Sequence, residues 1–375
     1  MHFSNKYLRI IMQLCLFIIT IPFKVIGYLI PNKNNIWVFG NTFGYKDNAK
    51  YLYEYICLST DYKIRAIWIT KDRNTKTIGE HYYYLSFKGL YFQYLCSVVF
   101  LTTGMNDLAS FTLTKKYIVQ LWHGIPIKKI LLDSSEISPI PNQFILLNRI
   151  FRFLLKKKLK KYNLVCATDK KNQECLTKAF GIDASKVPIT GTPRQKIIKD
   201  NAIKIKPERK ILYAPTWQDS DKKALKWIYY VLTKDFIDFL NKSNIKLDLL
   251  IHPLNHKITS EVNLKDINII KPIDINIVLG EYMLLITDFS SIALDFSLLE
   301  RPVLFSCYDM DEYIKDRGIY YDYLQILNKS KLDNTQLIYS IDLFFNNNKP
   351  LSLLLTEEIN TNPMENIIQG IKKKK

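Results

Sequence analysis

The feature that most constrains the fold of this 375-residue chain is an alternation of short apolar runs with helical patterns after residue 31. Several runs are almost continuously apolar, which is typical of strands in a parallel sheet that is covered on both faces. The expected strands span residues 36–40, 64–70, 98–103, 117–122, 164–168, 211–215, 247–252, 267–270, 283–287 and 302–306. The expected helices between them span residues 49–58, 144–161, 172–180, 227–240 and 292–299.

This alternation predicts an α/β protein with parallel sheets. At roughly 150 residues per domain, the length fits two domains. The break between them is expected near residues 193–210, a polar stretch rich in lysine. A hydrophobic share of 48% argues against disorder. Only one early segment approaches the length of a membrane span, which argues against a polytopic membrane protein.

The charge of the chain is concentrated in its first half. The formal net charge is +18, and residues 1–161 carry 23 Lys and Arg against 8 Asp and Glu. Residues 162–371 are nearly neutral, with 26 basic and 27 acidic side chains. A basic half indicates an anionic partner, which can be nucleic acid, phospholipid or an anionic polymer.

Two segments of the basic half are candidates for membrane contact. Residues 10–30 are apolar but contain Lys24, and no cleavage site typical of a signal peptide follows. This favours a helix that lies in the membrane interface, with a spanning helix and a soluble core helix as alternatives.

The second segment, residues 144–161, joins an apolar stretch to a basic run without acidic residues. It predicts a basic amphipathic helix on an anionic membrane. A solvated lysine face and a nucleic-acid contact are the alternatives, although no recognition motif for nucleic acid accompanies the charge. The predicted membrane-binding residues are Arg152, Lys156, Lys157, Lys158, Lys160 and Lys161.

Two of the five histidines, His123 and His252, follow expected strands, where ligands bind in open α/β sheets. An imidazole there can accept a proton from an attacking hydroxyl or donate to a phosphate oxygen. We expect both to occupy equivalent places in the two half-chains and to face one interdomain cleft, the alternative being hydrogen-bonded structural histidines. His256 near His252 has no evident third partner, so no metal site is predicted.

Hydroxyl and arginine side chains after other strands predict a phosphate site. Ser290 and Ser291 precede an expected helix, whose first N–H groups attract phosphate. Arg194 follows a Gly-Thr-Pro turn and can bind phosphate with two N–H groups, and Arg317 before Gly318 is a weaker case. Serine capping and solvated arginines are the alternatives. The remaining predicted nucleotide and phosphate contacts are Thr216, Thr287 and Asp288.

Six motifs occur along the chain: QLWHGIPIKK (120–129), ITGTPR (189–194), ILYAPTW (211–217), IHP (251–253), LITDFSS (285–291) and RPVLF (301–305). As a set they resemble the CDP-glycerol glycerophosphotransferase family, and the resemblance covers roughly residues 35–325. It implies a GT-B-like fold with two Rossmann-type domains and a CDP-activated donor in the second. These enzymes build teichoic acids and related polymers of cell walls and capsules.

The resemblance implies transfer of glycerol phosphate from CDP-glycerol to a hydroxyl of a lipid-linked or polymeric acceptor, with release of CMP. His123 would be the general base, while His252, Ser290 and Ser291 would bind the pyrophosphate. No cofactor or metal is expected. The implied location is the cytoplasmic face of the membrane, as a peripheral protein with the anionic membrane surface as a partner.

Several alternatives stay open at this point. The donor can be CDP-ribitol, or a nucleotide sugar in a glycosyltransferase of the same architecture. A non-catalytic membrane adaptor and a nucleic-acid binder are further possibilities, although we expect no nucleic-acid partner. The acceptor, the oligomeric state and the choice between primase and polymerase are open.

The expected domain organisation has four parts. Residues 1–31 form a membrane-associating segment, and residues 32–196 an acceptor-side domain with the basic amphipathic helix. Residues 197–345 form the domain that binds the CDP donor, and residues 346–375 a C-terminal helix with a basic tail.

Overall fold

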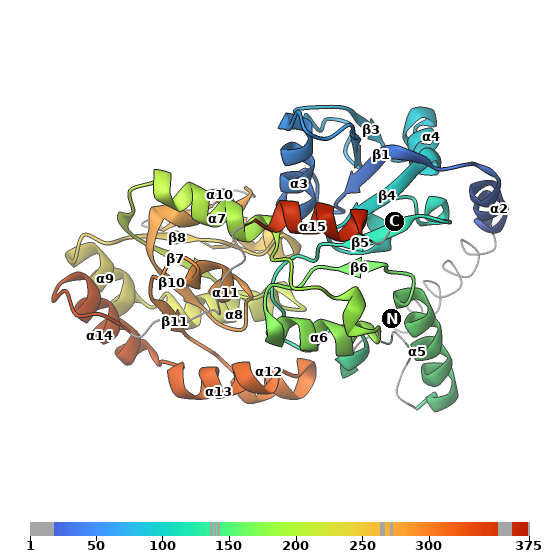
Figure 1. Cartoon of the computed structure of the whole chain (residues 1–375). Helices are drawn as coiled ribbons and strands as arrows, with labels where there is room; N and C mark the ends of the chain where they lie inside the picture. The colour runs from blue at the N-terminus through green and yellow to red at the C-terminus, as the bar shows by residue number, and fades with distance from the viewer. Residues whose placement is uncertain are drawn as a thin grey trace. The chain divides into compact units, whose positions relative to one another are not determined.

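The computed structural model of the chain describes residues 19–135, 138, 140, 143–262, 267–270, 273–351 and 362–373. The chain divides into two compact units, which Figure 1 shows with their helices and strands. Unit 1 comprises Met1–His123, Leu131–Arg194 and Asn360–Lys375. Unit 2 comprises Gly124–Ile130 and Gln195–Ile359.

Unit 1 is built on a six-stranded parallel sheet in the order β3-β2-β1-β4-β5-β6. Strand β4 is buried along its whole length, and β1 is buried from Ile36 onward, as expected for a sheet covered on both faces. The strands are β1 (Lys33–Gly40), β2 (Arg65–Thr70), β3 (His81–Tyr83), β4 (Cys96–Leu101), β5 (Tyr117–Gln120) and β6 (Leu164–Val165). The helices are α2 (Ile21–Leu29), α3 (Asp47–Leu58), α4 (Phe87–Leu95), α5 (Ile145–Leu159), α6 (Lys170–Phe180) and α15 (Pro363–Lys372).

Unit 2 is built on a five-stranded parallel sheet in the order β11-β10-β7-β8-β9. The strands are β7 (Glu208–Ala214), β8 (Lys246–Leu249), β9 (Asn268–Ile269), β10 (Tyr282–Thr287) and β11 (Val303–Phe305). The helices are α8 (Asp221–Val231), α9 (Lys234–Lys242), α10 (Ile275–Val278), α11 (Ile292–Ser297), α12 (Met310–Arg317), α13 (Tyr321–Ser330) and α14 (Asn334–Phe345). Helix α7 (Pro193–Lys204) begins at the last residues of unit 1 and continues into unit 2.

Both sheets have the strand order of a Rossmann fold. In each, the first strand in the chain lies between the second strand and the fourth, so that the order reverses between β1 and β4 and between β7 and β10. Ligands of open α/β sheets bind beyond the carboxyl ends of the strands at this switch point. The structure therefore confirms the expected α/β class with parallel sheets, and it locates one candidate ligand site in each unit.

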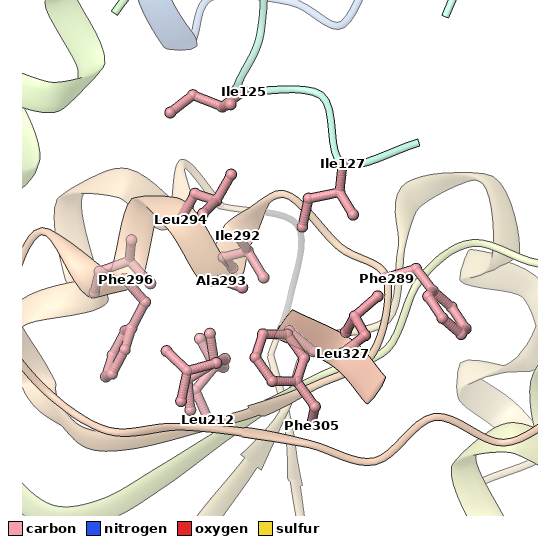
Figure 2. Close-up of a cluster of buried hydrophobic side chains, with 14 of the residues drawn as sticks. Ile125, Ile127, Leu212, Phe289, Ile292, Ala293, Leu294, Phe296, Phe305 and Leu327 are labelled. Atoms are coloured by element: carbon pink, nitrogen blue, oxygen red, sulfur yellow. The ribbon is translucent and has the colours of Figure 1, made fainter. Parts of the chain in front are cut away.

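A short segment of the early chain, Gly124–Ile130, belongs to unit 2. Figure 2 shows Ile125 and Ile127 on a stretch of chain beside Ile292 and Leu294 of α11, and all four are buried in one apolar cluster. The Lys129 amide donates to the Gly318 carbonyl at 3.1 Å, which adds a backbone connection. The chain therefore leaves unit 1 directly after His123, a feature that no sequence pattern indicated.

All ten expected strands are present, with ends shifted by a few residues, and β3 is an additional strand that was not expected. The single helix expected over residues 227–240 was wrong, because α8 and α9 are separate. The Thr233 hydroxyl accepts the Phe236 amide and so caps α9 at its start. The expected break near residues 193–210 contains the unit boundary at Arg194, but most of that stretch is helix α7.

The C-terminal helix α15 returns the chain to unit 1. Its apolar side chains Ile367, Ile368 and Ile371 are buried. Its Glu365 carboxylate accepts hydrogen bonds from the hydroxyls of Tyr55 and Tyr62. The end of the expected basic tail, residues 374–375, lies outside the described residues.

Candidate active site

A buried aspartate joins the ends of β1 and β4 at the switch point of unit 1, where the strand order reverses. Asp107 lies in a short 3₁₀ turn (Met105–Asp107) after β4, and its side chain is fully buried. Its carboxylate accepts the amides of Thr42 after β1, at 2.9 Å, and of Thr102 after β4, at 2.8 Å. These bonds hold together the ends of the two central strands. Asp107 was not predicted, because a lone aspartate in a turn has no distinctive sequence pattern.

His123 lies one residue beyond the expected end of the neighbouring strand β5 and three beyond its observed end at Gln120, and it is exposed. Its Nδ1 atom is 3.2 Å from the carbonyl oxygen of Thr102. Since a carbonyl only accepts, Nδ1 carries the ring proton and Nε2 presents a lone pair. The Trp122 ring packs beside the imidazole at a centroid distance of 4.4 Å. The neutral imidazole is thus oriented as a proton acceptor.

The surroundings of His123 favour its neutral form. Desolvation by the protein atoms around the ring lowers the pKa of His123, and the positive charge of Arg194 lowers it further. The Asp47 carboxylate and the hydrogen bond to Thr102 act in the opposite direction, but the net shift of this pKa is downward. A neutral histidine near pH 7 is the protonation state that a general base requires.

Arg194 lies in unit 1 beside His123. Its side chain is only 8% exposed, its Nη1 donates to the His123 carbonyl at 2.5 Å, and it pairs with Asp47 at 3.5 Å. The guanidinium that was expected to bind phosphate is therefore engaged by the protein chain around the histidine. Asn48, at the start of α3, bonds the amide of Arg194 and the carbonyl of Trp122 at 2.8 Å each, and the sequence analysis missed it.

A second buried aspartate closes the switch point of unit 2. The Asp288 carboxylate, after β10, accepts the Thr216 hydroxyl and its backbone amide, at 2.9 Å, from the loop after β7. Desolvation raises the pKa of Asp288 to about 6, although the bonds from Thr216 oppose the shift. Thr287 is fully buried and its hydroxyl donates to the Ala214 carbonyl at 2.6 Å. Thr287 therefore joins the two strands rather than facing an open site.

The loop that follows β7 brings the other predicted residues of unit 2 together. The Gln218 amide donates to the side-chain oxygen of Asn255 at 3.0 Å, which fixes the loop to the turn after His252. Arg317 donates to Asp219 at 2.5 Å and its guanidinium lies 4.6 Å from the Trp217 ring centroid. Thr216, His252, Asp288 and Arg317 are thus parts of one connected group of segments in unit 2.

His252 has the opposite tautomer to His123. Its Nδ1 accepts the backbone amide of Leu254 at 3.2 Å, so that the proton of the neutral ring is on Nε2 and can be donated. His252 follows β8, the second strand of its unit, whereas His123 follows β5, the fifth strand of the other. The expectation of equivalent positions in the two halves was therefore wrong, although both follow the carboxyl end of a strand.

Ser290 and Ser291 are half-buried and directly precede α11, as expected. The Ser291 hydroxyl makes no capping bond to the helix, so that helix capping does not account for it. Helix α11 is only six residues long, so its dipole is small. Among the described residues, no group of three or more His, Cys, Asp or Glu side chains is arranged to hold a metal ion.

The predicted membrane-binding segment forms helix α5, whose apolar side chains Leu146, Phe153 and Leu154 are 57–69% exposed. The six predicted basic residues are exposed along its second half and just after it, and Arg152 also donates to the Leu132 carbonyl. No helix within the described part of the chain is long and apolar enough to cross a membrane. Residues 10–18 of the other predicted segment lie outside the described residues.

Helix α2 of the same segment is described, and it is held to unit 1 by backbone contacts. The Tyr94 hydroxyl donates to the Phe23 carbonyl at 2.9 Å, and Lys115 donates to the Tyr28 carbonyl at 2.5 Å. Burial and the nearby charge of Lys161 lower the pKa of Lys24. Figure 1 shows both helices on the same side of unit 1.

Comparison with known proteins gives a consistent result. Residues 23–343 match the family described as CDP-Glycerol:Poly(glycerophosphate) glycerophosphotransferase. The chain is 26% identical over 336 residues to a teichoic acid glycerol-phosphate transferase of Staphylococcus aureus, covering 83% of this chain and 84% of that protein. It is also 26% identical over 346 residues to a teichoic acid poly(glycerol phosphate) polymerase of Bacillus spizizenii, covering 85% and 86% of the two chains.

The fold is similar to that of a solved structure of the wall teichoic acid polymerase TagF soaked with CDPG. The TM-score is 0.66 at 19% identity, over 99% of this chain and 98% of that one. This likeness establishes a GT-B-like fold. Because the family match extends over most of both units, the chain is an enzyme that belongs to the CDP-glycerol:poly(glycerophosphate) glycerophosphotransferase family.

Proposed function

We propose that this enzyme transfers glycerol phosphate from CDP-glycerol to a hydroxyl of a lipid-linked or polymeric cell-surface acceptor. The acceptor oxygen attacks the phosphorus that bears glycerol, an O–P bond forms, and the P–O bond to the cytidine phosphate breaks. The acceptor proton moves to His123, and CMP leaves. Phosphoryl transfer of this kind requires mainly in-line positioning and charge stabilisation, which a few polar side chains can supply.

The opposite tautomers of the two histidines are the observation that carries the proposal. His123 presents a lone pair at Nε2 because its Nδ1 donates to Thr102. His252 presents a proton at Nε2 because its Nδ1 accepts from Leu254. The first is suited to remove a proton from the acceptor hydroxyl, and the second to donate to a phosphate oxygen as charge develops on the departing CMP.

The donor is proposed to bind to unit 2 at its switch point, near Thr216 and Asp288. Ser290 and Ser291 supply hydroxyl donors to the pyrophosphate, together with His252. Asp288 holds the Thr216 loop through its two hydrogen bonds, so it acts on the donor indirectly. Arg317, which is bound to Asp219 in the same group, is a proposed phosphate contact. We assign Arg194 to the support of His123, because its guanidinium is bonded in unit 1.

The second part of the proposal is attachment to an anionic membrane through unit 1. The exposed apolar residues of α5 and α2 would enter the lipid interface, with the lysines at the headgroups. This is supported by the exposure of Leu29, Leu146 and Phe153, each at least 66%. A lipid-linked acceptor would then be held at the surface on which the enzyme lies.

A test of the donor measures nucleotide release. The purified protein is incubated separately with CDP-glycerol, CDP-ribitol, UDP-sugars and GDP-sugars, each with a synthetic lipid-linked acceptor, and free nucleotide is assayed. The proposal predicts CMP release from CDP-glycerol that depends on acceptor. Release from CDP-ribitol alone would make the enzyme a ribitol-phosphate transferase, and UDP or GDP release would make it a glycosyltransferase.

A further inference from the structure

The chain leaves unit 1 at two points, and both are next to His123. One is the peptide between His123 and Gly124, and the other is the peptide between Arg194 and Gln195. These points are 71 residues apart in sequence, yet Nη1 of Arg194 donates to the His123 carbonyl at 2.5 Å. The catalytic histidine of the proposed function is therefore the last residue of the first segment of unit 1, and it lies where two chain segments meet.

One side chain bonds both segments. The Asn48 side-chain oxygen accepts the Arg194 amide at 2.8 Å, and its nitrogen donates to the Trp122 carbonyl at 2.8 Å. Asn48 is fully buried. An amide is the group that fits, because one partner requires an acceptor and the other requires a donor. A carboxylate would lose the second bond, and an apolar side chain would lose both.

The bond to Trp122 acts on a strained backbone. Trp122 has φ +61°, in the left-handed region that a bulky residue rarely adopts and that costs on the order of 1 kcal/mol or more. This conformation turns the chain so that the next residue, His123, reaches the Thr102 carbonyl with Nδ1. Without the Asn48 donor to the Trp122 carbonyl, other backbone conformations compete and the imidazole of His123 loses its fixed direction.

We infer that Asn48 is a positioning residue for the transfer reaction, which aims the imidazole of His123 by fixing the backbone of Trp122 and Arg194. The inference rests on the proposed function, in which His123 is the general base. Asn48 contacts the backbone of Trp122, directly before the base, and of Arg194, whose guanidinium bonds the His123 carbonyl, and it does not itself take part in proton transfer.

Asn48→Ala is expected to lower kcat and to leave KM nearly unchanged. A misplacement of a catalytic group by about 1 Å can lower the rate by about 100-fold, so Asn48→Ala should lower kcat by about that factor. The KM for CDP-glycerol should stay within about twofold, because the proposed donor contacts lie in unit 2 and are unaltered. Loss of folded enzyme also lowers the apparent kcat at an unchanged KM, so kcat is expressed per folded enzyme, with the folded fraction taken from the unfolding measurements.

The pH profile supplies a readout of His123 itself. The charged groups that affect its pKa are Asp47, Asp107 and Arg194, together with the Thr102 carbonyl. Desolvation is the largest cause of its lowered pKa. Loosening the chain moves the ring away from the protein atoms that desolvate it, which raises the pKa of His123 toward its ordinary value. The acidic limb of kcat/KM should therefore move to higher pH in Asn48→Ala.

A matched control is available in the same unit. Gln93 is also a fully buried amide, and its side chain bonds the Tyr84 carbonyl at 2.7 Å and the Ala109 amide at 2.8 Å. Gln93→Ala should destabilise unit 1 but leave kcat and the acidic limb unchanged. Asn48→Asp is a second variant of unchanged size, which keeps an acceptor for Arg194 and loses the donor to Trp122. It should fold and also lose at least about tenfold in kcat.

The experiment measures steady-state kinetics from pH 5.5 to 9 for the wild type and the three variants, with thermal unfolding of each. Lowered kcat and a displaced acidic limb in both Asn48 variants, but not in Gln93→Ala, are expected. If the wild type is active and the folded Asn48 variants match it within threefold at an unchanged limb, the inference is wrong. If the wild type releases no CMP from CDP-glycerol, the proposed function fails instead.

Discussion

Identical residue types in this enzyme take different properties from their partners. His123 and His252 are both imidazoles that follow strands, yet a carbonyl fixes one as an acceptor and an amide fixes the other as a donor. Asp288 is a buried carboxylate that accepts hydrogen bonds from the amide and the hydroxyl of Thr216. Its raised pKa of about 6 follows from that environment.

The raised pKa of Asp288 makes a prediction about stability. Since the folded state keeps this proton up to about pH 6 and the unfolded chain loses it near 3.8, the contribution of Asp288 to stability falls as pH rises between these values. Between pH 5 and 7.5 the wild type should lose about 1 kcal/mol of stability relative to Asp288→Asn, whose side chain does not titrate. Urea unfolding of both proteins at the two pH values measures this difference.

The control for this prediction is Asp235, an exposed carboxylate that also lies in unit 2. Asp235→Asn, in the first turn of α9, should follow the pH dependence of the wild type. If Asp288→Asn also follows it, the pKa of Asp288 is close to the ordinary value and the account of this residue is wrong.

At the residue scale, the positions of the two histidines, the two serines and Asp288 after strands were predicted correctly, because polar side chains after apolar runs are visible in the sequence. Asn48 and Asp107 were not predicted. Asn48 acquires its role from partners 74 and 146 residues away, and no local pattern reports such contacts. The contact of the Arg194 guanidinium with the His123 carbonyl was not predicted for the same reason, since the two residues are 71 positions apart in sequence, and phosphate binding by Arg194 stays a prediction.

Helix α5 exposes both apolar and basic side chains. Phe153 and Lys157 are four residues apart and so share a face, on which the apolar first part of the helix continues into its basic end. Arg152 bonds the carbonyls of Leu132 and Ser134, which fixes the helix to the preceding turn. Such a helix presents apolar side chains and cations together to any anionic interface.

This arrangement predicts the effect of one charge on membrane binding. Phe153→Glu should lower binding to vesicles that contain anionic lipid by about tenfold or more, since a buried Phe side chain contributes about 2 kcal/mol. Co-sedimentation with anionic and with zwitterionic vesicles measures the bound fraction. Ile203→Glu is the matched control, because Ile203 is 86% exposed on α7 of unit 2, outside the proposed face.

Binding of the control should equal that of the wild type, and all three proteins should bind weakly to zwitterionic vesicles. Equal binding of Phe153→Glu and the wild type would show that α5 does not enter the lipid. Strong binding to zwitterionic vesicles would contradict the role given to the lysines.

At the element scale, continuous apolar runs predicted ten strands because burial on both faces leaves this pattern. The edge strand β3 was missed, since its three residues are only half-buried and carry no such run. The break between α8 and α9 was missed because Leu232 and Thr233 fit a helical pattern. The capping bond from Thr233, which decides the break, is a local contact that periodicity does not report.

Considered as a whole, the molecule places its two candidate chemical functions on separate units. The proposed base His123 and its proposed supports Arg194 and Asn48 lie in unit 1, and the proposed donor contacts lie in unit 2. The sequence pattern predicted two α/β units. It did not predict that Gly124–Ile130 belongs to unit 2 or that α15 packs on unit 1. Both depend on long-range packing, which length and composition do not reveal. The predicted interdomain cleft stays a prediction.

The central claim is that the enzyme joins glycerol phosphate to an acceptor hydroxyl. In this claim His123 is the base, and His252 donates a hydrogen bond to a phosphate oxygen. Mass spectrometry of a synthetic lipid-linked acceptor incubated with CDP-glycerol tests it most directly. The wild type should add the mass of one or more glycerol-phosphate units, and His123→Ala and His252→Ala should each form at least about 100-fold less product. An unmodified acceptor with the wild type, or full product with both histidine variants, would contradict the account.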